Sequence, residues 1–140
     1  MVADQVVVSL FPCSFSGGVR RVPVGSKVVV KLGWEAKEKG LVQSFLKAQT
    51  TTVAVGGTAP VDISDAYGPI EPAPNGNFRS HVHFDTGVTL GDGDALQVDG
   101  VMTLSHLVPD GLTLADEDTH RPQFFGPGTP FTLGCRITAS

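Results

Sequence analysis

The chain has 140 residues, of which 41% are apolar and 17% charged, and its formal net charge is −4. This length suits one domain with a substantial core, and the content of Leu, Ile, Val and Phe argues against disorder. The sequence has no run of about 18 apolar residues, which excludes a single helix spanning a membrane. We expect one domain over residues 1–140.

The first half of the chain shows the alternation of apolar and polar residues that is typical of strands. Residues 6–10 are a first predicted strand, and residues 27–34 are a second, in which alternate side chains from Val28 to Trp34 share an apolar face. Apolar residues recur at helical spacing over residues 40–49, which predicts a short helix. Residues 51–55 and 61–63 follow as a predicted hairpin.

Three more strands are predicted in the second half. Residues 78–85 alternate between an apolar face and a face that carries Arg79, His81, His83 and Asp85. Residues 96–106 keep one parity throughout, with His106 on the side facing the core and a bulge or close approach at Gly100. The last predicted strand, residues 131–137, turns Cys135 toward the core.

About seven short strands separated by Gly- and Pro-rich turns favour an all-β fold, a two-sheet antiparallel sandwich with one short helix near residues 40–49. Residues 22–30 (VPVGSKVVV) and 88–98 (VTLGDGDALQV) resemble the turn-then-strand segments of bacterial immunoglobulin-like domains. The resemblance implies an immunoglobulin-like scaffold or adhesion module. It departs from antibody-type domains, because Cys13 and Cys135 lack the Cys…Trp…Cys spacing around Trp34.

His81 and His83 are the first candidate metal ligands, because an H-x-H pair on a strand projects both imidazoles from one face. The pair resembles the first half of a cupin metal motif, although cupins place a Glu shortly afterwards and this chain offers only Asp85. His106 and His120 are distant alternative ligands. The other interpretation is two surface histidines without a metal.

Acidic loops provide a second candidate site for a divalent metal, since hard cations prefer several carboxylate oxygens. Asp116 and Asp118 are the predicted ligands, and the other acids of these loops are Asp92, Asp94, Asp110 and Glu117. The segments do not match the EF-hand pattern, and solvated turn carboxylates are the simpler explanation. No other cofactor is expected.

The sequence offers no catalytic constellation and no predicted catalytic residue. It lacks G-x-S-x-G, and its Gly-rich turns lack the Lys and helix of a phosphate-binding loop. The single Trp is assigned to the inward face, which leaves no aromatic platform for a glycan. The enzyme question stays open, with a non-enzyme favoured.

The charge is unevenly distributed along the chain. Residues 1–50 carry seven Lys or Arg and three acids, whereas residues 51–140 carry three and eleven. Strands of a sandwich intermix these charges, so no basic face for nucleic acid is expected. The asymmetry reflects either chance or opposed faces that associate head to tail in a salt-sensitive way.

The cysteines leave the compartment open. Cys13 and Cys135 form either a bridge between the first and last parts of the sandwich or two buried thiols, and a bridge would suggest an extracytoplasmic location. The first residues lack the features of a signal peptide, so the protein is either intracellular or has lost such a peptide before reaching the cell surface.

Together these features predict a non-catalytic structural or binding module, such as a surface, appendage or assembly domain, that contacts a protein partner or itself. The alternative is a small cupin-like metal-binding protein or metalloenzyme that uses His81 and His83.

Overall fold

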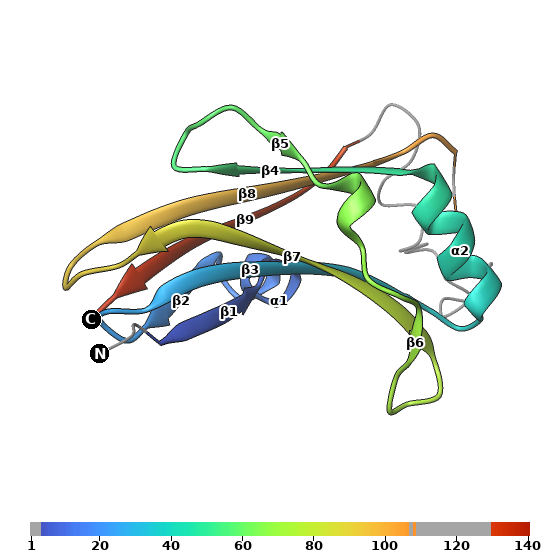
Figure 1. Ribbon diagram of the computed structural model, residues 1–140, viewed down its shortest axis with the longest axis horizontal. Coiled ribbons are helices and arrows are strands. Elements are labelled where there is room, and N and C mark those ends of the chain that lie inside the picture. The colour runs from blue at the N-terminus through green and yellow to red at the C-terminus, as the bar shows by residue number, and fades with distance from the viewer. Residues whose placement is uncertain (1–3, 107, 109–129) are drawn as a thin grey trace.

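The computed structural model describes residues 4–106, 108 and 130–140, which fold into two facing β-sheets (Figure 1). The strands are β1 (Gln5–Ser9), β2 (Val19–Val22), β3 (Lys27–Ala36), β4 (Gln49–Val55), β5 (Val61–Asp62), β6 (Glu71–Pro72), β7 (Phe78–Thr89), β8 (Ala95–Leu104) and β9 (Phe131–Ala139). The helices are α1 (Leu10–Phe15), α2 (Lys39–Ala48) and the 3-10 turn η1 (Ser64–Ala66). The predicted all-β, two-sheet architecture is confirmed.

One sheet has the strand order β1-β3-β7-β6 and the other the order β2-β9-β8-β4-β5. The prediction of purely antiparallel sheets is wrong at two places, because β1 pairs with β3 and β2 with β9 in parallel. Between β1 and β3 the chain passes through α1 and enters the other sheet as β2, so it returns to the first sheet in its original direction. The remaining pairings are antiparallel.

The core lies between the two sheets and consists of the inward residues of every long strand. On β3 the inward side chains are Val28, Val30 and Leu32, as the alternation predicts, and all three are buried. Gly100 of β8 faces them, and a Cβ atom there would lie 2.7 Å from Leu32 Cδ2. The expected close approach at this glycine is therefore confirmed, and the ladder shows no bulge at it.

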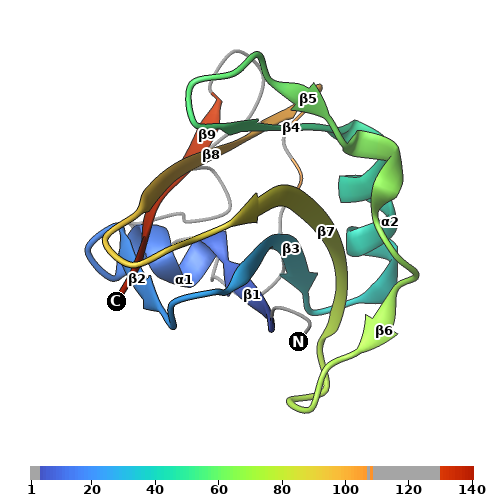
Figure 2. The ribbon, with the colours of Figure 1, turned by 60° about the vertical axis from the view of Figure 1, so that its left-hand side comes forward.

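Helix α2 connects the two sheets at one end of the sandwich (Figure 2). Its bounds match the predicted helix to within one residue. Phe45 is fully buried, with its ring stacked on Trp34 at 4.6 Å between centroids and edge-on to Tyr67 at 5.9 Å. Trp34 faces inward as predicted but is only half-buried, since it lies near the end of β3 under the helix.

Two features, at the chain's beginning and at the end of β8, differ from the prediction, and a third decides a question that the sequence left open. Leu10 begins α1 instead of ending a strand, and Cys13 of this helix forms a disulfide with Cys135 of β9, with 5.8 Å between their Cα atoms. The bridge decides between the two alternatives for the cysteines. Strand β8 ends at Leu104, so His106 lies beyond the strand and is exposed instead of facing the core.

Among the residues that the structure describes, no helix has the length and apolar character needed to cross a membrane.

Candidate functional site

His81 and His83 lie on the outer face of the β1-β3-β7-β6 sheet, as their parity predicts. His81 is opposite Gly33 in the neighbouring strand β3, where a Cβ atom would clash with Cδ2 of its imidazole ring. The missing side chain at Gly33 therefore makes room for the ring against the sheet. Nδ1 of His81 is 3.9 Å from Oε1 of Glu71, and the same oxygen is 3.3 Å from Nε of Arg79.

The environment of His81 favours its neutral form. Burial against the sheet lowers the pKa of the imidazole, and the positive charges of Lys31 and Arg79 lower it further, while Glu71 partly opposes them. A neutral imidazole is the form that binds metals. His83, two residues along, is exposed to solvent.

The structure brings together only part of the predicted metal ligands. Within residues 4–106, 108 and 130–140, no group of three or more His, Cys, Asp or Glu side chains is arranged to hold a metal ion. Asp94 has a structural role, since its carboxylate accepts a hydrogen bond of 2.8 Å from the N–H of Gly91 in the β7–β8 turn. Asp110, Asp116, Glu117, Asp118 and His120 lie outside the described residues. The metal-binding alternative stays a prediction.

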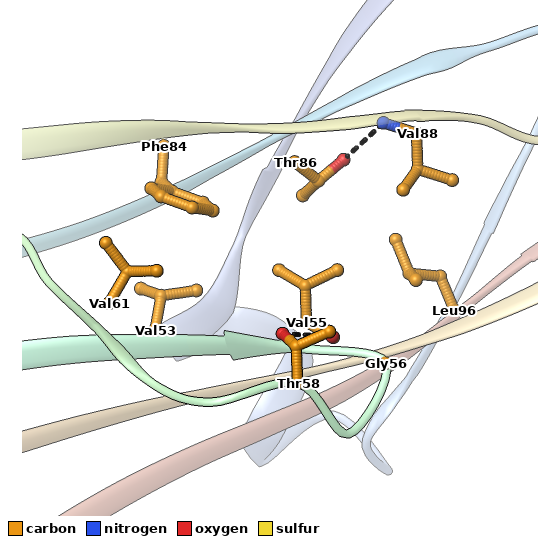
Figure 3. A pocket seen from close by; sticks show the side chains of 9 residues that line it. All are labelled: Val53, Val55, Gly56, Thr58, Val61, Phe84, Thr86, Val88 and Leu96. Atoms are coloured by element: carbon orange, nitrogen blue, oxygen red, sulfur yellow. Dashed lines mark hydrogen bonds between the residues drawn. The ribbon is translucent and has the colours of Figure 1, made fainter.

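A groove of about 390 Å³ opens between the edges of the two sheets (Figure 3). Phe84, Thr86 and Val88 of β7 form one wall and point toward the opposite sheet. The facing wall comes from β4, β5, β8 and the turn after β4, and its members are Val53, Val55, Gly56, Thr58, Val61 and Leu96. Every lining residue is aliphatic, aromatic, Thr or Gly.

The two hydroxyl groups in the groove already have partners. Thr86 donates to the carbonyl of Val28 at 2.7 Å and accepts the N–H of Val88 at 3.2 Å. Thr58 donates to the carbonyl of Val55 at 2.7 Å. The groove therefore offers a ligand apolar surface, since its hydroxyls are engaged within the protein.

The groove exists because the strands that border it are short. Strand β6 pairs with β7 only at Arg79 and Phe78, and β5 pairs with β4 only at Thr52 and Val53. Consequently the inward side chains farther along β7 are incompletely covered. Phe84 and Val88 pack against the core but remain half-buried.

A separate apolar surface lies on α1 and β9, the two elements that the disulfide joins. The rings of Phe11 and Phe15 on α1 and Phe131 on β9 form a cluster, with centroids 4.9 Å apart for Phe11 and Phe15, 6.0 Å for Phe11 and Phe131, and 6.1 Å for Phe15 and Phe131. Phe11 is 48% exposed and Phe15 59% exposed. We call these three residues the phenylalanine cluster.

Sequence reasoning missed both surfaces. The alternation assigns Phe84 to the core, and only the short lengths of β5 and β6 leave it half-covered. The spacing of Phe11 and Phe15 is helical, but the preceding run of valines led us to continue the strand through Leu10. A Phe pair at i and i+4 just after a strand was the available signal.

The chain matches no protein family model, no curated protein and no solved structure.

Proposed function

We propose that the chain is a non-catalytic binding module that receives apolar side chains of a protein partner in the groove between its sheets. The observation that carries this proposal is that Phe84, Val88 and Val55, which point into the sandwich, are left half-buried beside an opening. Contiguous apolar surface of this kind commonly marks an interaction site. The lining side chains can contact apolar groups of a partner, and none of them is an acid or a base.

The strand order supports an immunoglobulin-like type for this module. Four strands in the order β1-β3-β7-β6 correspond to the A-B-E-D sheet, and β9-β8-β4-β5 correspond to G-F-C-C′ of the variable type. Two features depart from that type. Strand β1 runs parallel to β3, and the disulfide joins α1 to β9 instead of joining the B and F strands across the core.

Two further observations bear on partners and location. The phenylalanine cluster supports contact with a protein, including a second copy of the chain, because exposed aromatic side chains are enriched at interfaces. The disulfide supports an extracytoplasmic location, where such bonds persist. Opposed charged faces receive less support, since Lys27 of β3 lies 3.9 Å from Asp85 of β7 and the charges of the two halves intermix there.

Selection of a random peptide library displayed on phage tests the binding proposal. The chain is the target, and the variant Val61→Asp, which places a charge in the groove, is the counter-target. Val24→Asp is the matched control, because Val24 is 51% exposed, Val61 is 47% exposed, and only Val61 lines the groove. We expect apolar-rich peptides that bind the wild type and Val24→Asp but not Val61→Asp. Failure to enrich any peptide that distinguishes Val61→Asp from the wild type would refute the proposal.

A further inference from the structure

Strand β7 has an unpaired edge beside the groove. On the side away from β3, β7 pairs with β6 at Arg79, and the carbonyl of His81 accepts the N–H of Gly68 at 2.8 Å. Backbone groups of alternate residues point to the same side of a strand. The N–H and C=O groups of His83 and Asp85 therefore face this same edge, and no strand among the described residues pairs with β7 there.

This edge and the groove lie on the same side of the sandwich. Strand β7 continues past the short β6, and this part of it lies across the groove from β4 and β5 of the second sheet (Figure 2). Phe84 and Thr86 alternate with His83 and Asp85 along β7 and line the groove. A segment hydrogen-bonded to the edge would have every second side chain directed over Phe84, Val61 and the rest of the apolar wall.

We propose that the groove binds an extended peptide segment of a partner protein, which adds to the edge of β7 as a further strand over His83–Asp85. This inference rests on the proposed function and names its ligand class. Strand addition of this kind uses backbone hydrogen bonds for affinity and alternating side chains for specificity. The four backbone groups at His83 and Asp85 that no described strand pairs with favour a strand over a helix, whose own backbone groups are already paired.

The charge around the groove defines the flanks of that peptide. Asp62 follows Val61 on β5 and is exposed beside the groove, whereas Asp85 points to the outer face of its sheet, where its carboxylate lies 3.9 Å from Nζ of Lys27. Hydrogen bonds from Ser64 lower the pKa of the Asp62 carboxyl, which therefore stays ionised. The occupant is consequently a segment with apolar residues at alternate positions and a basic residue at the end that lies beside Asp62.

A synthetic peptide, Lys-Val-Thr-Val-Thr-Val-Lys with blocked termini, is the probe, and fluorescence anisotropy of a labelled copy measures its binding to the full chain. The shuffled peptide Lys-Val-Val-Thr-Thr-Val-Lys keeps the composition but breaks the alternation. A peptide with Glu at both ends reverses the flanking charge. We expect both control peptides to bind more weakly than the probe.

Backbone methylation of the probe tests strand pairing without changing the protein. One peptide carries an N-methyl group on the central valine and the other on the threonine before it. Because alternate N–H groups of a strand point to opposite sides, only one of the two methylations should block pairing with β7. Loss of one backbone hydrogen bond of ordinary strength corresponds to about two- to tenfold weaker binding, and we expect a difference of this size between the two peptides.

The protein variant His83→Pro tests the same edge from the other side. The N–H of His83 points away from β3, so proline removes an edge donor and leaves the β3–β7 ladder intact. His83→Thr is the matched control, since it also removes the imidazole but keeps the N–H. We expect His83→Pro to weaken binding about two- to tenfold and His83→Thr to leave it unchanged, with circular dichroism verifying the fold of both.

The outcomes separate this inference from the proposed function. Strand addition is overturned if Val61→Asp weakens binding of the probe but His83→Pro and both methylations leave it unchanged. The groove would then bind by side chains alone. No binding of the probe overturns the inference, whereas the displayed library decides the proposed function independently. Displacement of the probe by increasing concentrations of the Val61→Asp variant, which should not bind the probe itself, would identify a second copy of the chain as the occupant and would overturn a separate partner.

Discussion

The disulfide between Cys13 and Cys135 should be a major source of stability. It closes a loop with a sequence separation of 122 residues, which is most of the chain. Chain-entropy arguments give roughly 5 kcal/mol for a loop of this size, and removal of a native bridge from a small domain typically costs about 2–5 kcal/mol. We therefore expect reduction of the bond to lower the free energy of unfolding by about 2–5 kcal/mol.

Urea unfolding of three samples separates the cross-link from the packing of its atoms. The samples are the oxidised wild type, the fully reduced wild type, and the double variant Cys13→Ala with Cys135→Ala. Both cysteines are buried, with 7% and 0% exposure. The difference between oxidised and reduced wild type therefore reports the cross-link, while the smaller further loss in the double variant reports the missing sulfur atoms.

Two results would contradict this reasoning. Mass spectrometry could find two free thiols after mild oxidation, in which case Cys13 and Cys135 are not bridged. Alternatively, the reduced and oxidised forms could unfold within about 1 kcal/mol of each other, well below the range for a loop of this length.

Four further predictions concern the core, the outer histidines and the apolar surfaces. Phe45→Ala should lower the free energy of unfolding by about 3–5 kcal/mol, and Trp34→Ala by less, because Phe45 is fully buried and Trp34 only partly buried. The reverse order of the two variants in urea unfolding would contradict this packing. Burial lowers the pKa of His81 below its usual 6.5. The contribution of the neutral imidazole to the free energy of unfolding is therefore complete above pH 6.5 and is lost as the pH falls toward the lowered pKa. His81→Gln should remove this part of the pH dependence of stability, and an unchanged dependence in the variant would disprove the prediction. Metal analysis of tag-free protein should find the same metal content in the wild type and in His81→Ala. A stoichiometric metal that is present in the wild type and lost in His81→Ala would instead establish the metal-binding alternative. Phe15→Asp should reduce any self-association seen by sedimentation velocity, with Val24→Asp as the matched control, whereas equal association of both variants would exclude the phenylalanine cluster as the contact.

Local patterns in the sequence predicted most of the elements. Strands with one apolar face carry their own signal, because side chains alternate between solvent and core at every second residue. This is why the inward faces of β3, β7 and β8 and the helix α2 agree with the prediction. Gly100 was recognised for the same reason, since a glycine on an inward face indicates a close neighbour.

Features that depend on the length over which neighbouring strands pair were not visible in the sequence. The alternation of β7 is the same at Ser80, where the strand is covered, and at Phe84, where it borders the groove. The lengths of β5 and β6 on the neighbouring edges make the difference, and such short segments produce little periodic signal. The parallel pairing of β1 with β3 likewise follows from the path of the chain through α1 into the other sheet.

The sequence by itself determined that the chain is an all-β protein and which residues of its long strands face inward, because apolar and polar residues alternate along those strands. Only the tertiary structure decided where the two sheets separate, which side chains therefore line an opening, and that Cys13 meets Cys135. These are long-range consequences of strand order and length, and no local pattern encodes the distance between two edges that are far apart along the chain.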